Sequence, residues 1–149
     1  ELSHEIDLAN FFFGTPVALF SYHTTSPLLH TDVEDSSVIV ATCNSCNPLT
    51  FRLNFCTSPA RRVITMRSRE FELNYDLICS KLVINSLSSP PVNRYFYNDS
   101  SALFNSQLQS FVYAMHGHDT NLRTVSEAFD TLDFILECKS HNSFGLFDD

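Results

Sequence analysis

Phe71–Ile84, with the sequence FELNYDLICSKLVI, is the stretch on which the predicted fold depends. Apolar or aromatic side chains alternate strictly with polar ones from Phe71 to Leu77. This period of two predicts a half-buried β-strand, because successive side chains of a strand point to opposite faces. From Leu77 onward the stretch turns apolar on both faces, which is typical of a strand that passes under another layer. The sequence therefore predicts one long strand over Phe71–Ile84.

The residues after this strand predict a second strand and then a helix. Ser88–Pro91 break the strand pattern, and Arg94–Tyr97 restart it as a short aromatic strand. Asn98–Ser100 offer side chains that can cap a helix N-terminus. The helix is predicted over Ser100–Met115, where apolar residues recur at broadly helical spacing.

The rest of the chain predicts a mainly β domain, with one helix before it and a second amphipathic helix late in the chain. Regular short strands without a long crossover favour a small closed β-barrel with one or two flanking helices, and a β-sandwich is the nearest alternative. The 149 residues predict a single domain, with a helical extension over 1–16, the barrel and helices over 17–141 and a tail over 142–149. The further elements are the helix Leu2–Phe13, the strands Val17–Tyr22, Val38–Cys43, Phe51–Phe55 and Val63–Met66, the helix around Leu122–Phe129 and the closing strand Leu132–Cys138.

Composition and charge disfavour several functional classes. Only 3 glycines occur in the chain, which argues against a glycine-rich phosphate loop or a glycine-based nucleotide fingerprint. No apolar run approaches the roughly 20 residues that a membrane-spanning helix needs. The formal charge of −8 disfavours a protein whose main task is non-specific binding to phosphate backbones. No nucleophile paired with a base is visible, so the sequence predicts no enzymatic activity.

The positive charge is concentrated in one segment. Five of the nine Lys and Arg residues lie between positions 52 and 69, a stretch without Asp or Glu. One interpretation is a solvated hairpin edge, where cationic side chains discourage strand-to-strand aggregation. The other is a strip that contacts nucleic acid or another anion. The candidate nucleic-acid-binding residues are Arg61, Arg62, Arg67 and Arg69.

The cysteines suggest a metal site. Cys43 and Cys46 form a C-x-x-C pair, the spacing of a zinc knuckle, and Cys56 is the candidate third ligand. The same pair is compatible with a disulfide or with reduced thiols, so the cofactor prediction is one structural zinc or none. Cys79 and Cys138 lie in apolar strand patterns and are interpreted as small core residues.

Placed in order, these elements resemble one branch of the oligonucleotide/oligosaccharide-binding (OB) fold. It is the branch of the C-terminal domain of the replication protein A large subunit and of telomere end-protection proteins. The resemblance rests on the Cys43–Cys46 knuckle, the alternating strand Phe71–Ile84, the strand and cap Tyr95–Ser101 and the closing strand Asp133–Cys138. The second cysteine pair of the family's knuckle is absent.

The resemblance implies a non-enzymatic binding or scaffold module of a single-stranded-DNA- or telomere-associated complex in the nucleus. The acidic charge and the many aromatic residues favour docking of a protein subunit over gripping of single-stranded nucleic acid, and no membrane role is expected. The alternative is a secreted or viral β-rich domain that binds a host protein. The predicted partner surface comprises Leu108, Phe111, Val112, Met115, Leu122, Val125 and Phe129.

Overall fold

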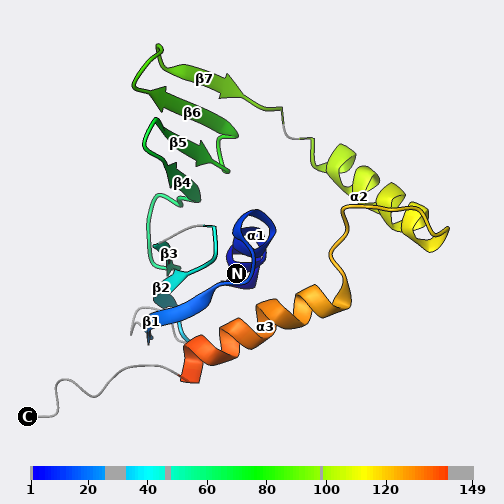
Figure 1. Cartoon of the computed structure of the whole chain (residues 1–149), viewed down its shortest axis with the longest axis horizontal. Helices are drawn as coiled ribbons and strands as arrows, with labels where there is room; N and C mark the ends of the chain where they lie inside the picture. The colour runs from blue at the N-terminus through cyan, green and yellow to red at the C-terminus, as the bar shows by residue number, and fades with distance from the viewer. Residues whose placement is uncertain (1, 26–32, 46–47, 98, 141–149) are drawn as a thin grey trace, which may run out of the picture. The chain divides into compact units, whose positions relative to one another are not determined.

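The computed structural model describes residues 2–25, 33–45, 48–97 and 99–140 (Figure 1). The chain forms two compact units. Unit 1 comprises Glu1–Cys56 and Arg123–Asp149, and unit 2 comprises Thr57–Leu122. The single domain expected from the chain length stays a prediction.

Unit 1 is a three-stranded antiparallel sheet with two helices packed on one face. The strands β1 (Val17–Thr24), β2 (Ser36–Thr42) and β3 (Leu49–Asn54) pair in the order β1-β2-β3. The helices are α1 (Leu2–Phe13) and α3 (Val125–Ser140). Between helices and sheet lies the described core, which comprises Ile6, Ala9, Ile39, Ala41, Phe51, Phe134 and Cys138.

The core of unit 1 is formed where the inward-facing side chains of β2 and α3 meet. These side chains alternate along the strand and recur at helical spacing along the helix. In β2 the residues Ser37, Ile39 and Ala41 are buried and the residues between them are half-buried, as expected for a strand with one covered face. In α3 the buried residues Thr131, Phe134 and Cys138 recur at helical spacing. The strand face and the helix stripe therefore meet in one apolar layer.

Unit 2 is a four-stranded antiparallel sheet followed by a helix. Its strands are β4 (Val63–Arg67), β5 (Phe71–Asp76), β6 (Lys81–Ser86) and β7 (Val92–Tyr95), which pair in sequence order. The helix α2 spans Ser100–Met115, as predicted. The Asp99 side chain caps it by accepting hydrogen bonds from the backbone N–H groups of Ser101 and Ala102 at 2.9 and 3.4 Å.

The prediction of one long strand over Phe71–Ile84 is wrong, because the chain reverses in its middle. The stretch forms the hairpin β5–β6. The carboxylate of Asp76 accepts hydrogen bonds from the backbone N–H groups of Ile78 and Cys79 at 2.9 and 3.0 Å, which closes the turn. These hydrogen bonds hold the pKa of Asp76 below its usual value. The turn also places Cys79 at the surface, so its predicted burial is wrong, whereas Cys138 is buried as predicted.

The predicted closing strand Leu132–Cys138 is also wrong, because this segment belongs to α3. A capping box begins the helix: Thr124 N–H donates to the Glu127 carboxylate at 2.6 Å, and Glu127 N–H donates to the Thr124 hydroxyl at 3.2 Å. The same hydrogen bonds lower the pKa of Glu127. Once this turn is helical, the apolar residues that follow it continue the helix.

Together these two differences rule out the closed OB-type barrel. A barrel of that type needs a long central strand and a last strand that closes the sheet. The described strands instead form two separate open sheets with antiparallel pairing throughout. Among the described residues, no helix is long and apolar enough to cross a membrane.

Candidate functional site

Helix α1 is held rigidly in unit 1. Ile6 is fully buried and Ala9 is nearly so, and both pack into the core beside Phe134. Gly14 ends the helix with a φ of 81°, a conformation that glycine adopts without a steric penalty. Because one stripe of α1 is fixed by packing, the backbone positions of its other residues are defined.

A polar seam of Asp7, Asn10, Arg123 and Thr131 joins α1 to the start of α3. Arg123 Nε lies 3.2 Å from Asp7 Oδ1, close enough for an ion pair although poorly aligned for a hydrogen bond. The Thr131 hydroxyl donates to Asp7 Oδ1 at 3.3 Å, and Asn10 Nδ2 donates to Thr131 Oγ1 at 2.8 Å. The seam therefore ties residues of α1 to residues more than a hundred positions away.

His4 stands on the first turn of α1, one turn before Asp7, and its side chain is exposed. The other described histidines are placed differently. His23 is buried, and its ring nitrogens lie 2.8 Å from Ser37 Oγ and 3.3 Å from the Cys138 carbonyl. His116 Nδ1 lies 2.8 Å from the Val112 carbonyl at the end of α2, and the exposed His118 lies just beyond that end with its ring against Tyr113. His4 thus combines an accessible imidazole with a packed helix, the combination that acid–base chemistry requires.

A second polar cluster lies beneath the C-terminal turn of α3 and is structural. Ser21 Oγ donates to the Cys138 carbonyl at 2.5 Å, and His23 contacts the same carbonyl. That carbonyl belongs to the last helical turn, where backbone acceptors lack helical partners. Burial raises the pKa of the Cys138 thiol to about 11. The cluster caps the helix, and its thiol is a core residue rather than a nucleophile.

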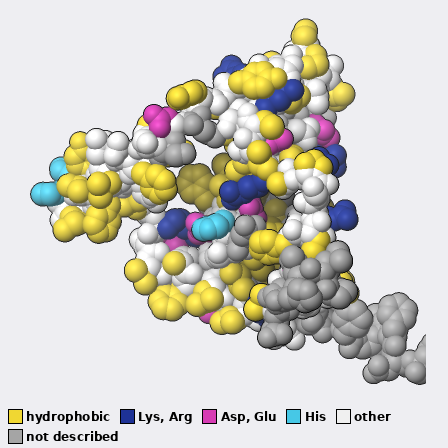
Figure 2. Space-filling model, turned by 180° about the vertical axis from the view of Figure 1, so that it is seen from behind, with side chains coloured by type: hydrophobic (Ala, Val, Ile, Leu, Met, Phe, Trp, Pro, Cys, Tyr) yellow, Lys and Arg dark blue, Asp and Glu magenta, His cyan; other side chains and the backbone are white. Residues whose placement is uncertain are grey.

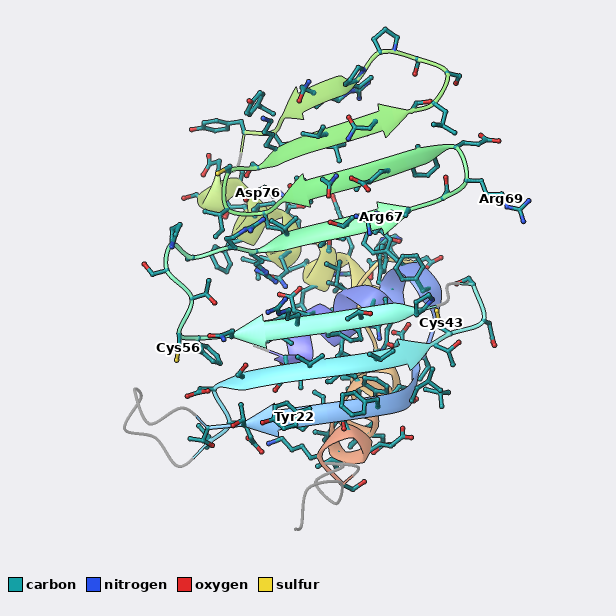
Figure 3. The ribbon with its side chains drawn as sticks, turned by 90° about the vertical axis from the view of Figure 1, so that its left-hand side faces the viewer. Tyr22, Cys43, Cys56, Arg67, Arg69 and Asp76 are labelled. Atoms are coloured by element: carbon teal, nitrogen blue, oxygen red, sulfur yellow. The ribbon has the colours of Figure 1, made fainter. Side chains whose placement is uncertain are left out.

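The four candidate arginines of the basic segment, residues 52–69, lie at different ends of strand β4. Arg61 and Arg62 precede β4 in the sequence. Arg67 ends β4, and Arg69 lies in the following turn (Figure 3). Arg67 Nε donates to Glu72 Oε2 at 2.6 Å, and this bond keeps the pKa of Glu72 low. The turn lines an open hollow of ≈ 370 Å³, in which Glu70 and Glu72 balance the two arginines. The four predicted residues therefore form two pairs at opposite ends of one strand, and their binding role stays a prediction.

The predicted zinc ligands are not brought together. Cys43 follows β2 and Cys56 follows β3, so antiparallel pairing places them at opposite ends of these strands (Figure 3). Cys46 lies outside the described residues. Within the described part of the chain, no group of three or more His, Cys, Asp or Glu side chains could hold a metal ion.

The predicted partner surface lies on exposed helix positions. Hydrophobic side chains cover much of the surface of α2, at the left of Figure 2. The exposed set includes Leu108, Phe111, Val112 and Met115 on α2 and Val125 and Phe129 on α3, while Leu122 is half-buried. The residues on α2 belong to unit 2 and those on α3 belong to unit 1. Their role in binding a partner stays a prediction.

Comparison with known proteins identifies the fold. No protein-family model and no curated protein matches the sequence, but solved structures match nearly all of the chain. UDP-N-acetylglucosamine 3-dehydrogenase GnnA from Acidithiobacillus ferrooxidans superposes with a TM-score of 0.77 at 16% identity, over 94% of this chain and 44% of that chain. This chain therefore shares its fold with the matched part of that dehydrogenase.

Two further structures support the same fold. The WlbA dehydrogenase from Bordetella pertussis in complex with NADH and UDP-GlcNAcA has a TM-score of 0.71 at 11% identity, over 94% of this chain and 43% of that one. Levoglucosan dehydrogenase in complex with NADH and levoglucosan has a TM-score of 0.72 at 14% identity, over 93% of this chain and 46% of that one. This chain spans less than half the length of each of the three.

These matches correct the functional predictions. The OB-fold resemblance is wrong, because the structural neighbours are dehydrogenases. The predicted function, a non-enzymatic scaffold of a DNA- or telomere-associated complex, is wrong for the same reason. The alternative, a secreted or viral domain that binds a host protein, is wrong as well. The prediction of no enzymatic activity is wrong for the same reason. The cofactor prediction of zinc or none is also wrong, since two of these neighbours hold NADH. Nuclear localisation stays a prediction.

The described residues do not fit a dinucleotide on their own. A dinucleotide site of the doubly wound type needs parallel strands and a glycine-rich turn at a helix N-terminus. All described strand pairs are antiparallel. Gly14 and Gly117, with φ near +80°, instead follow the C-terminal ends of α1 and α2. A nicotinamide cofactor would therefore have to be held by polypeptide other than the described residues.

Proposed function

We propose that this chain is the antiparallel part of an NAD(P)-dependent oxidoreductase that acts on a hydroxyl group of a sugar or sugar derivative. The observation that carries the proposal is the match of 94% of the chain to GnnA with a TM-score of 0.77. The substrate class rests on the neighbours, which include a UDP-N-acetylglucosamine dehydrogenase and a levoglucosan dehydrogenase. The part of the enzyme that binds the dinucleotide is assigned to other polypeptide, because the described residues do not fit that cofactor.

In this proposal His4 is the acid–base residue. Oxidation of an alcohol requires a group that takes the hydroxyl proton, and imidazole is the side chain most often used near neutral pH. His4 is exposed on a helix whose opposite stripe is buried. The polar seam through Asp7 and Arg123 fixes that helix against α3. Together these features would hold the imidazole in position while leaving it open to a substrate.

A turnover assay tests the proposal. The full product of the gene that encodes this chain is incubated with NAD⁺ or NADP⁺ and either UDP-N-acetylglucosamine or levoglucosan, and NAD(P)H is followed by absorbance. We expect a rate that saturates with one sugar and vanishes when the sugar or the nucleotide is omitted. A panel of hydroxylated sugars extends the assay if neither probe reacts. A complete lack of nucleotide-dependent turnover across that panel would contradict the proposed function.

A further inference from the structure

A hollow of ≈ 370 Å³ lies at one end of the unit 2 sheet. Its lining comes from the end of β4, the turn that follows, the start of β5 and the end of β6 with the residue after it. Figure 3 labels two of the lining residues, Arg67 and Arg69, at this end of the strands. All of the lining belongs to unit 2. The volume falls within the range of about 300–1,000 Å³ that is usual for small-molecule sites.

Hydrogen bonds hold the frame of the hollow. The Ser68 N–H donates to the Phe71 carbonyl at 2.9 Å, which closes the turn between β4 and β5. The Ser68 hydroxyl accepts from the backbone N–H groups of Glu70 and Phe71, both at 3.1 Å. The Leu87 N–H donates to the Glu70 carbonyl at 3.1 Å, so the end of β6 is joined to the same turn. The side chains of the hollow therefore project from an ordered backbone, which lowers the entropy cost of binding.

The lining combines apolar and polar groups. The Phe71 ring is 43% exposed, and Leu87 is 88% exposed. Asn85, also exposed, is paired with Glu72 on the neighbouring strand, and Ser86 is paired with Phe71. An amide both donates and accepts hydrogen bonds, as does a hydroxyl. The lining thus matches a sugar ring, whose C–H groups contact apolar surface while its hydroxyls exchange hydrogen bonds with polar side chains.

The charges of the lining cancel. Arg67 and Arg69 are matched by Glu70 and Glu72, so the formal charge sums to zero. Glu72 is already engaged, because its Oε2 accepts from Arg67 Nε at 2.6 Å and its Oε1 accepts from Asn74 Nδ2 at 2.8 Å. An anion would have to compete with two carboxylates for the arginines, at a cost in like-charge repulsion. The lining therefore favours a neutral polar ligand over a phosphate or a carboxylate.

We propose that this hollow binds one pyranose unit of a neutral sugar. Phe71 contacts the C–H face of the ring, and Asn85 and Ser86 exchange hydrogen bonds with its hydroxyls. The proposed function assigns proton transfer to His4 in unit 1, whereas the hollow is lined by unit 2 alone. The site therefore serves binding rather than turnover, and it does not depend on the proposed function.

Amide chemical shifts of the ²H,¹⁵N-labelled full gene product test the site. The neutral probes methyl β-D-glucopyranoside, methyl β-D-galactopyranoside and methyl α-D-mannopyranoside are added in separate titrations. We expect at least one probe to shift the amide signals of residues 67–72 and 85–87 along saturable curves. The dissociation constant should be on the order of 1 mM, which is usual for a ligand of this size. It should stay within about twofold between low and high salt, because a neutral ligand is not screened.

Two phenylalanine variants locate the binding. Phe71→Ala should weaken binding of that probe at least about tenfold, because the contact with the sugar ring is lost. Phe104→Ala is the matched control, since Phe104 is 71% exposed on α2 and does not line the hollow. It should change the dissociation constant by less than about twofold. If Phe71→Ala does not fold, Asn85→Leu, which removes the amide at similar size, should weaken binding about fivefold.

A titration with inorganic phosphate provides the contrast. Saturable shifts at the same amides with phosphate and with none of the three glycosides would overturn the proposal and assign an anion site. No saturable shift at these amides with any glycoside, or equal weakening by Phe71→Ala and Phe104→Ala, would also overturn it. The amide signals report on this hollow whether or not the gene product turns over a sugar, so failure of the proposed function would leave this result unchanged.

Discussion

His4→Asn is expected to lower kcat of the full gene product by about 10²–10⁴-fold, the usual contribution of a positioned acid–base group. Asparagine keeps a similar size and can still form hydrogen bonds, but it cannot take or return a proton near neutral pH. His4 is exposed and does not belong to the core, so the variant should unfold at the temperature of the wild type. Steady-state turnover with NAD⁺ and the preferred sugar measures the effect.

His118→Asn is the matched control for this prediction. His118 is also an exposed histidine, but it lies beyond the end of α2 with its ring against Tyr113. Its replacement should leave kcat within about twofold of wild type, since surface changes away from a site have small effects. If His4→Asn retained turnover close to wild type, the acid–base role of His4 would be contradicted.

Phe134→Ala is expected to destabilise unit 1 by about 3–5 kcal/mol, the usual cost of truncating a buried phenylalanine. The Phe134 side chain is 2% exposed, and its ring centre lies 6.3 Å from that of Phe51. The loss of this contact leaves a cavity between α3 and the sheet, which the surrounding side chains fill only in part. Urea denaturation followed by circular dichroism measures the change in the free energy of unfolding.

Phe129→Ala on the same helix is the control, because that ring is 59% exposed. It should change the free energy of unfolding by no more than about 0.5 kcal/mol. If Phe134→Ala does not fold, Phe134→Leu provides a smaller truncation at the same site. Equal effects at the two phenylalanines would contradict the packing of α3 against the sheet.

The local elements could be predicted where their signals lie close together in the sequence. The helices Leu2–Phe13 and Ser100–Met115 have the predicted bounds, because each combines apolar periodicity with a cap or a helix end nearby. The turn inside Phe71–Ile84 could not be predicted in this way. Asp76 fits the strand alternation as a polar position, and Ser80 adopts a φ of +52° without a glycine to mark it.

Helix α3 carried a signal that could have corrected the predicted closing strand. Thr124 and Glu127 have the spacing of a capping box, which predicts that a helix begins just before the apolar run. The run Phe134–Leu136 is by itself compatible with a strand or a buried helix. Weighing the box together with the run would have favoured the helix and excluded a closed barrel.

The candidate site could not be predicted because its parts are far apart in the chain. Asn10 and Thr131 are separated by 121 residues, and no pattern near His4 or Asp7 indicates their partners on the α3 side. The absence of a glycine fingerprint disfavoured a dinucleotide turn in this chain. It did not exclude an enzyme, because a cofactor site can reside in a different domain from the rest of the active site.

A titration with NADH tests the central claim most directly. Nicotinamide fluorescence is followed as NADH or, in a parallel series, NADPH is added to the 149-residue chain and, separately, to the full product of its gene. We expect no saturable change with the 149-residue chain and a saturable change with the full product, because the dinucleotide site is assigned to other polypeptide. Absence of NADPH and NADH binding by the full product would contradict the claim that this chain is part of an NAD(P)-dependent oxidoreductase.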